Sequence, residues 1–146
     1  MTGENIRENI RDEILKAANL LAAADLLAEN GFINDAVSRL YYYLFYYIRA
    51  LLLTESLQPK THEGTFRLLG MHFVNNGLLN RSISLIFSKL MKYRQDADYN
   101  PSFFFTEADF KEFREEAVQA AFDIQEFLKK RGYIKLQKGN ERERND

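Results

Sequence analysis

Hydrophobic residues recur at intervals of three and four positions along most of this chain. This spacing places apolar side chains on one face of an α-helix, whereas a half-buried strand would alternate apolar and polar residues. Glycine and proline, which end helices, fall mainly between the periodic segments. The pattern therefore predicts helices at about residues 5–30, 34–55, 62–75, 79–97 and 106–131, and no strand.

Helix-end signals divide the predicted helices. Gly31 provides a stop after the first helix, and Thr61 is the predicted N-cap of the third. Thr106, followed three residues later by Asp109, predicts a capping box at the start of the fifth. Because the connections are short, neighbouring helices are expected to run antiparallel. The predicted fold is an all-α, up-and-down antiparallel helical bundle of four long helices plus one shorter helix, formed by residues 1–131.

Composition narrows the class of protein without pointing to a partner. The chain has 146 residues, of which 46% are hydrophobic and 28% charged, as expected for one soluble globular domain. The net charge is only −1 and there is no cysteine, which excludes disulfides and thiolate metal sites. The N-terminal stretch lacks the apolar core of a signal peptide, and no apolar run reaches the length of a membrane span. We expect a cytoplasmic protein that does not enter a membrane.

The C-terminal residues 132–146 are predicted to form a basic, flexible tail. From Lys129 to Asp146 the chain has seven basic and three acidic residues. Such an excess of positive charge is typical either of a solvated, disordered tail or of an arm that contacts RNA. The sequence leaves both interpretations open.

Familiar catalytic and cofactor-binding patterns are absent from the sequence. The two histidines, His62 and His72, have no acidic partner at the spacing of metal ligands, so we predict no metal site. His62 stands at a helix start, where a capping or surface position is the common case. The chain also lacks a P-loop, a dinucleotide-binding fingerprint and a nucleophile elbow, and no cofactor is predicted.

The second helix carries tyrosines and arginines on a face of their own. In the stretch SRLYYYLFYYIRA, residues 38–50, these side chains lie roughly opposite the aliphatic stripe. They are Arg39, Tyr42, Tyr46 and Arg49. Tyrosine and arginine are favoured at protein interfaces, and they also stack on bases and hold phosphates. This face is predicted to be either a dimer interface or an RNA-stacking surface, and the two coincide if a cleft forms at the dimer seam.

The stretch YRQDADYNP, residues 93–101, closes the fourth helix. Arg94 and Asp98 are four residues apart, which places them on the same helical face and suits an ion pair. Pro101 disfavours helical geometry at the residue before it, and a frayed helix end would let Tyr99 swing beside Arg94. Spacing alone favours a helix end with a surface ion pair over a functional site.

Four stretches together resemble a known family. DAVSRLYYYLFYYIRALLL, KTHEGTFRLL, FVNNGLL and LMKYRQDADY follow one another between about Asp35 and Tyr99. Their succession is similar to that of the small stand-alone HEPN proteins of bacteria and archaea, and the resemblance extends over about residues 5–130. It implies a helical bundle that forms a homodimer and associates with RNA or nucleotides. It also implies a minimal nucleotidyltransferase as partner, in a toxin–antitoxin pair.

The resemblance also implies roles for single residues. In the ribonuclease members, an arginine holds the scissile phosphate and is followed, after four to six residues, by a histidine that helps move the 2′-hydroxyl proton. Arg94 matches the arginine, but no histidine follows it. With Arg94, the neighbouring Asp98 and Tyr99 are the candidate catalytic residues, although an ordinary tyrosine is a poor base at pH 7. In some pairs a tyrosine near the motif receives AMP from the nucleotidyltransferase, and by analogy Tyr99 is the candidate AMP acceptor.

Three functions stay open at this point. The first is a dimeric RNA- or nucleotide-binding HEPN protein that pairs with a nucleotidyltransferase, with a dimer cleft lined by Arg39, Tyr42, Tyr46, Arg49 and Arg94. The second is an active, metal-independent ribonuclease toxin that uses Arg94 without the usual histidine. The third is a purely structural helical adaptor dimer. The absent histidine leaves open whether the chain is an enzyme, and the first function accounts for more of the sequence.

Overall fold

Five α-helices and one π-helix make up the computed structural model, which describes residues 2–135. They are α1 (Gly3–Glu29), α2 (Ile33–Leu53), α3 (His62–Leu69), the π-helix η1 (Gly70–Val74), α4 (Ser82–Tyr99) and α5 (Glu107–Lys130). No strand occurs in this part of the chain. The predicted all-α fold is confirmed, and each predicted helix is present with ends that differ by a few residues.

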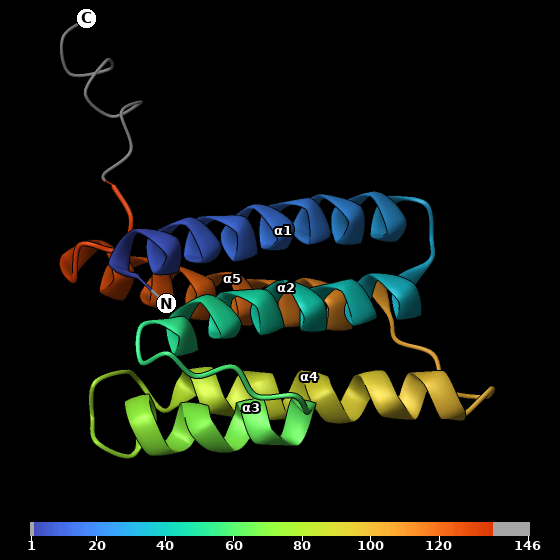
Figure 1. Cartoon of the computed structure of the whole chain (residues 1–146). Coiled ribbons are helices and arrows are strands. Elements are labelled where there is room, and N and C mark those ends of the chain that lie inside the picture. Colours follow the sequence, from blue (N-terminus) through green and yellow to red (C-terminus); the bar gives the residue numbers. More distant parts are fainter. Residues whose placement is uncertain (1, 136–146) are drawn as a thin grey trace, which may run out of the picture.

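The four long helices alternate in direction. In Figure 1, α1 and α2 lie side by side and antiparallel, and α4 and α5 continue the alternation. The short α3 lies against α4 and runs antiparallel to it, because the linker of residues 54–61 passes back along the bundle before α3 begins. Both α3 and α4 contact α2, and the candidate site forms where these three helices meet.

Helix α2 is the centre of the hydrophobic core. The inward stripe that the spacing predicts for this helix is buried, and so are residues on other sides of the helix. The stripe consists of Ala36, Leu40, Tyr43, Leu44, Tyr47 and Leu51. The additional buried residues include Val37, Tyr41, Ile48 and Leu52. The single apolar stripe predicted for α2 is too narrow, because α1, α3, α4 and α5 all pack against this helix and leave little of it exposed.

Helix α1 approaches α2 through small side chains. Ile10, Ala17 and Ala24 follow one another at seven-residue intervals and are fully buried. The distance between packed helices depends on the side chains at their contact, so alanine at two of these positions allows a close approach. Elsewhere on α1, Asp25 accepts hydrogen bonds of 2.7 and 2.8 Å from Arg114, and this paired contact joins α5 to α1.

The predicted helix-end signals are confirmed. Thr61 Oγ1 accepts a hydrogen bond from the backbone N–H of Gly64 at 2.9 Å, which makes Thr61 the N-cap of α3. Thr106 and Asp109 form the reciprocal capping box of α5, with hydrogen bonds of 2.9 and 3.1 Å. Gly31 follows α1 with a φ of 85°, a left-handed conformation that glycine adopts without strain. These local interactions determine where the helices begin and end.

The chain after α5 returns to the bundle. Tyr133 donates a hydrogen bond from its hydroxyl to the carbonyl oxygen of Thr54 at 3.4 Å, and Ile134 packs against the core. Residues 132–135 of the predicted tail therefore contact the helices. The rest of that tail, residues 136–146, lies outside the described residues.

Candidate functional site

Arg94 of α4 lies over the rings of two tyrosines of α2. Its Cζ atom is 5.0 Å from the ring centre of Tyr41 and 5.6 Å from that of Tyr42. Only 16% of the Arg94 side chain is exposed. A cation held over an aromatic face is attracted to it, and the attraction grows as water is excluded. The aromatic rings of α2 therefore position Arg94. The spacing of Arg94 and Asp98 in the sequence predicted the ion pair but not these contacts with the tyrosines.

The charge of Arg94 is only partly neutralised. Nη1 donates a hydrogen bond to Asp98 Oδ2 at 3.4 Å, the ion pair expected from the four-residue spacing. The contact is long and Asp98 is 48% exposed, so the pair contributes little to stability. Nε of Arg94 is buried and has no hydrogen-bond partner within residues 2–135. A guanidinium with unused donors is suited to binding an anion such as phosphate.

His62, the first residue of α3, belongs to the same cluster. A hydrogen bond of 2.5 Å connects its Nδ1 to the hydroxyl oxygen of Tyr41. The centre of the imidazole ring is 5.5 Å from that of Tyr41 and 6.1 Å from that of Tyr42. The Thr61 cap holds the backbone at this point. Arg94 and His62 thus flank the same two tyrosines, although they come from different helices.

The ring of Tyr41 joins this cluster to the core. It is fully buried and stacks on Phe87 of α4, with ring centres 5.4 Å apart and 8° between the planes. Burial raises the pKa of the Tyr41 hydroxyl far above its ordinary value, and the charge of Arg94 opposes this shift only in part. Tyr41 therefore stays neutral at pH 7 and acts as a hydrogen-bonding partner rather than as a base.

The surroundings of His62 favour its uncharged form. Burial lowers the pKa of the His62 imidazole below its ordinary value of 6.5, and the positive charge of Arg94 lowers it further. An uncharged imidazole can accept a proton, and a neighbouring guanidinium can stabilise negative charge. The cluster thereby combines a proton acceptor with an anion-binding group.

The three predicted catalytic residues do not all lie together. Arg94 and Asp98 are paired, whereas Tyr99 is the last residue of α4 and is 85% exposed. The helix remains regular as far as Tyr99, because Pro101 restricts only the residue before it, Asn100, which is extended. Tyr99 is therefore accessible from solvent and does not fold back over the Arg94 guanidinium.

The predicted tyrosine–arginine face of α2 forms a row along the helix. Arg39 is exposed at its start, and Tyr42 and Tyr46 are half-buried. Tyr42 contacts Arg94, while Tyr46 lies beneath the Arg49 guanidinium, 5.5 Å from its Cζ atom. The row therefore has an arginine over an aromatic ring at two places, and the ring of Tyr42, at the first of them, also contacts the His62 ring.

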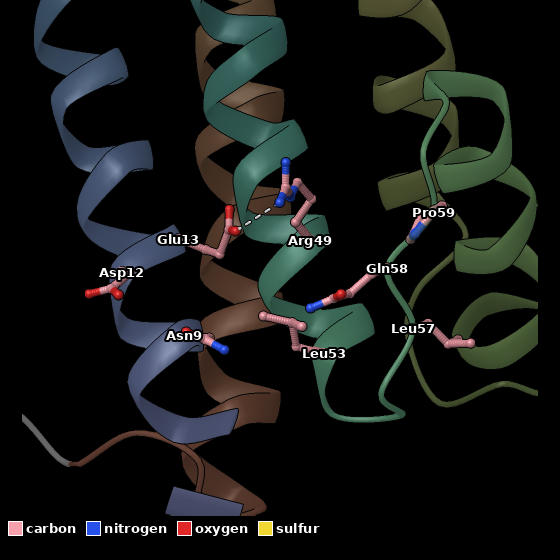
Figure 2. A pocket seen from close by; sticks show the side chains of 8 residues that line it. All are labelled: Asn9, Asp12, Glu13, Arg49, Leu53, Leu57, Gln58 and Pro59. Atoms are coloured by element: carbon pink, nitrogen blue, oxygen red, sulfur yellow. Dashed lines mark ion pairs between the residues drawn. The ribbon is translucent and has the colours of Figure 1, made fainter. Parts of the chain in front are cut away.

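A pocket of about 300 Å³ adjoins Arg49 (Figure 2). It is formed by α1, the C-terminal half of α2 and the linker of residues 54–61. Glu13 of α1 points toward Arg49, and the two side chains form an ion pair at 3.2 Å. Burial raises the pKa of Glu13 above its ordinary value, and the charge of Arg49 opposes that shift. Arg49 is thus engaged with α1, in contrast to Arg94, whose Nε is unpaired.

Tyr41 and His62 are the two cluster residues that sequence reasoning missed. It assigned His62 to a capping or surface position and gave Tyr41 no role. The sequence does contain one signal, the spacing of four residues between Tyr41 and Phe45, which places both rings on one face of the helix. In the structure the Phe45 ring lies 4.8 Å from the His62 ring. The spacing does not indicate that His62 of α3 contacts this face of α2.

Two further observations concern residues 2–135 as a whole. No cluster of three or more histidine or acidic side chains that could hold a metal ion occurs among them. None of the helices they form is long and apolar enough to cross a membrane.

The chain is similar to several known proteins. The HEPN domain family matches residues 10–131. "Putative toxin MJ0605" of Methanocaldococcus jannaschii is 40% identical over 99 residues, which cover 68% of this chain and 74% of that relative. "UPF0332 protein PH1297" of Pyrococcus horikoshii is 39% identical over 77 residues, and "Putative toxin MJ0142" of M. jannaschii is 37% identical over 87. These two matches cover 53% and 60% of this chain, and little more than half of each relative, 54% and 59%.

Proposed function

This chain belongs to the HEPN domain family, and on that premise we propose that it is the toxin-type component of a HEPN–nucleotidyltransferase pair. In this proposal the protein forms a homodimer and binds RNA or a nucleotide in the cleft between the two protomers. Two of the similar proteins carry the name of a toxin, which supports placing this chain in the same class.

The observation that carries the proposal is the environment of Arg94. Two tyrosine rings hold the guanidinium, and its Nε has no partner among the residues described. Arginine binds phosphate through paired hydrogen bonds, and a side chain that is already held in place loses little entropy on binding. The half-buried Tyr42 and Tyr46 lie along the same helix and provide aromatic surface for bases. The arrangement is suited to a nucleotide or to single-stranded RNA.

Exposed apolar side chains support dimerisation. Phe66 of α3 and Met71 of η1 line one hollow with Ser84 of α4, and Leu85 of α4 is also exposed. Apolar groups gathered on a surface are typical of protein–protein contacts. A second copy of the chain would bury these side chains, and Leu85 lies on the same helix as Arg94.

Tyr99 is the proposed AMP acceptor. Its exposed position at the end of α4 leaves the hydroxyl open to the active site of another enzyme. AMP attached there would add negative charge and bulk to the helix that carries Arg94, five residues further along, and oppose RNA binding. The intact mass of the chain after coexpression with a minimal nucleotidyltransferase should show the adduct. We expect Tyr99→Phe to lose it and Tyr93→Phe to keep it; an adduct on Tyr99→Phe would exclude this acceptor.

RNA binding tests the proposal directly. We expect labelled single-stranded RNA to bind the wild-type protein at low salt, where phosphate contacts are strongest. Arg94→Gln should weaken binding by about tenfold or more, because a hydrogen bond to a charged group contributes about 1.5–3 kcal/mol. Fluorescence anisotropy measures the dissociation constants. Arg11→Gln, which changes an exposed arginine of α1, is the matched control and should leave the affinity nearly unchanged.

Two results would contradict the proposal. A wild-type protein that retains neither RNA nor nucleotide at low salt would instead be a structural adaptor. A monomer in sedimentation at micromolar concentration would remove the cleft between protomers on which the proposal depends.

A further inference from the structure

A groove of about 750 Å³ lies between the first half of α1 and the residues that follow α5. Its lining includes basic and apolar side chains but no acidic one. The basic side chains are Arg7, Arg11 and Lys135, and the apolar and aromatic ones are Ile14, Leu15, Tyr133 and Ile134. Because α1 lies on the far side of α2 from α4 (Figure 1), the groove is separate from the cluster around Arg94.

The positive charge of this groove is held in place without being neutralised. Arg7 Nε donates a hydrogen bond to the carbonyl oxygen of Gly132 at 3.2 Å, and Arg7 Cζ lies 5.9 Å from the centre of the Tyr133 ring. No ion pair engages any of the three basic side chains within residues 2–135. A chain whose net charge is only −1 therefore concentrates positive charge at this groove.

The acidic residues of α1 that are closest in sequence to these arginines face other directions. Glu8 and Asp12 each follow an arginine directly, and one step along a helix turns the side chain by about 100°. Asp12 lines the pocket of Figure 2 and not the groove. The groove is therefore complementary to a negatively charged ligand.

An exposed apolar face of α1 continues from the groove. Leu15 is 64% exposed, and Ala18, Ala22 and Leu26 follow it at intervals of three and four residues, all of them exposed. From Leu15 to Leu26 the helix rises by about 16 Å. The two alanines in the middle of this face let a second helix approach closely. The surface thus has the shape and the apolar character that an amphipathic helix of another protein fits.

We propose that the groove and this face bind an amphipathic helix of a protein partner, one whose apolar stripe ends in glutamate or aspartate residues. The carboxylates contact Arg7, Arg11 and Lys135, and the apolar stripe covers Leu15 and the alanines that follow it. Because the two arginines precede Leu15 on α1, they lie at one end of the face, and charge complementarity determines the direction in which the partner helix lies. The inference goes beyond the proposed function and does not depend on RNA binding.

RNA fits this surface less well than an acidic helix does. Proteins that hold single-stranded RNA offer aromatic faces on which the bases stack. Here the Tyr133 ring lies beneath the Arg7 guanidinium, and the other apolar side chains of the groove and of the exposed face are aliphatic. Covering an aliphatic surface is favourable for apolar side chains, whereas a sugar–phosphate backbone gains nothing from it.

Binding of a designed peptide to the full chain tests this inference. The probe is a fluorescein-labelled helical peptide with a leucine stripe at three- and four-residue spacing and glutamates at one end of that stripe. The matched control peptide has lysine in place of each glutamate. Fluorescence anisotropy at low salt should show that the acidic peptide binds more tightly than the lysine peptide by about tenfold or more. The difference should shrink as salt is added, because salt screens exposed charges.

Two variants of the protein, each with a matched control, separate the charged from the apolar contacts. Arg11→Glu should weaken binding of the acidic peptide by about tenfold or more, whereas Arg81→Glu, the same change at an exposed arginine beside α4, should not. Leu15→Ser should weaken it by about tenfold, whereas Leu78→Ser, at another exposed leucine, should not. All four substitutions are at exposed positions, and circular dichroism confirms that each variant is folded.

Amide chemical shifts of the wild-type chain locate the peptide without any variant. We expect the acidic peptide to shift the NMR signals of Arg7, Arg11, Leu15 and residues 132–135, and to leave those of Arg94 in place.

Several results would overturn the inference. They are absence of binding, equal affinity for the acidic and lysine peptides, full affinity in Arg11→Glu, and shifts confined to other parts of the chain. Groove signals that shift with protein concentration in the absence of peptide would make a second copy of the chain the occupant. Loss of RNA affinity in Arg11→Glu, with no peptide binding by the wild type, would make the groove an RNA surface. Failure of RNA binding alone would overturn the proposed function and leave this inference in place.

Discussion

Tyr41 connects the hydrophobic core to the candidate site through a single side chain. Its buried ring stacks on Phe87 and supports Arg94, while its hydroxyl is hydrogen-bonded to His62. A buried hydroxyl needs such a partner, because leaving it unsatisfied costs about 1–3 kcal/mol. One residue of α2 therefore positions two site residues that come from different helices.

We predict that the charge of Arg94 influences the protonation of the His62 side chain. Burial and the charge of Arg94 lower the His62 pKa, so Arg94→Gln should raise it toward 6.5, while Arg11→Gln should leave it unchanged. NMR titration of the His62 ring protons measures both effects. An identical His62 pKa in wild type and Arg94→Gln would show that the two side chains do not interact.

The same lowered pKa makes stability depend on pH. Because the His62 pKa is lower in the folded than in the unfolded chain, the unfolded chain binds more protons between the two values. The contribution of His62 to stability is therefore complete above about pH 6.5 and is lost as the pH falls through that value toward the folded-state pKa.

Helix α3 is short, and its first turn places His62. The Thr61 hydroxyl caps this turn, and Gly64 leaves room for it. A Cβ atom at Gly64 would lie 2.8 Å from Thr61 Oγ1, which is closer than the two atoms can pack. Gly64 and the Thr61 cap therefore form the first turn of α3 together, and this turn fixes the backbone position of His62.

Gly64→Ala tests this arrangement. The added methyl group should displace the Thr61 hydroxyl, and loss of an N-cap costs about 0.5–2 kcal/mol. A Cβ at Gly70 meets only Asn75 Nδ2 at 3.7 Å, an ordinary contact, so Gly70→Ala is the matched control. We expect Gly64→Ala to be less stable than Gly70→Ala by about 1 kcal/mol in thermal unfolding followed by circular dichroism. Equal stability would mean that the cap does not hold the start of α3.

The whole molecule is organised around α2, which the other helices enclose. Ala17 and Ala24 let α1 approach it closely, and the paired contact of Arg114 with Asp25 joins α5 to α1. With α2 enclosed, the ring of Tyr41 is fully buried between α2 and α4. The packing of the entire bundle therefore keeps the site in place.

Overpacking the contact of α1 with α2 should destabilise the bundle. Ala17 is fully buried, and inserting a larger side chain into a packed core costs about 1–3 kcal/mol, so Ala17→Leu should lower the free energy of unfolding by that amount. Ala18 is exposed on the same helix, and Ala18→Leu should change it by about 0.5 kcal/mol or less. Urea unfolding measures both, and a similar loss in the two variants would mean that α1 is not closely packed at Ala17.

The order of the helices and several of their ends could be predicted from the amino-acid sequence, although the π-helix η1 could not. Apolar periodicity and capping act between neighbours in the chain, as in Thr61 with Gly64 and Thr106 with Asp109. The ion pair of Arg94 with Asp98 was predictable for the same reason, since four residues make about one helical turn. A resemblance in the order of four segments was sufficient to indicate the family.

Only the tertiary structure decided which side chains meet at Arg94. Tyr41, His62 and Arg94 lie on three helices, and their contact depends on the linker of residues 54–61, which carries α3 back along the bundle. No histidine follows Arg94 closely along the chain, whereas the fold brings His62 of α3 to the two tyrosines that contact Arg94. The physical reason is that a core closes by burying apolar rings and satisfying buried hydroxyls, and both act on distance in space and not on order in sequence.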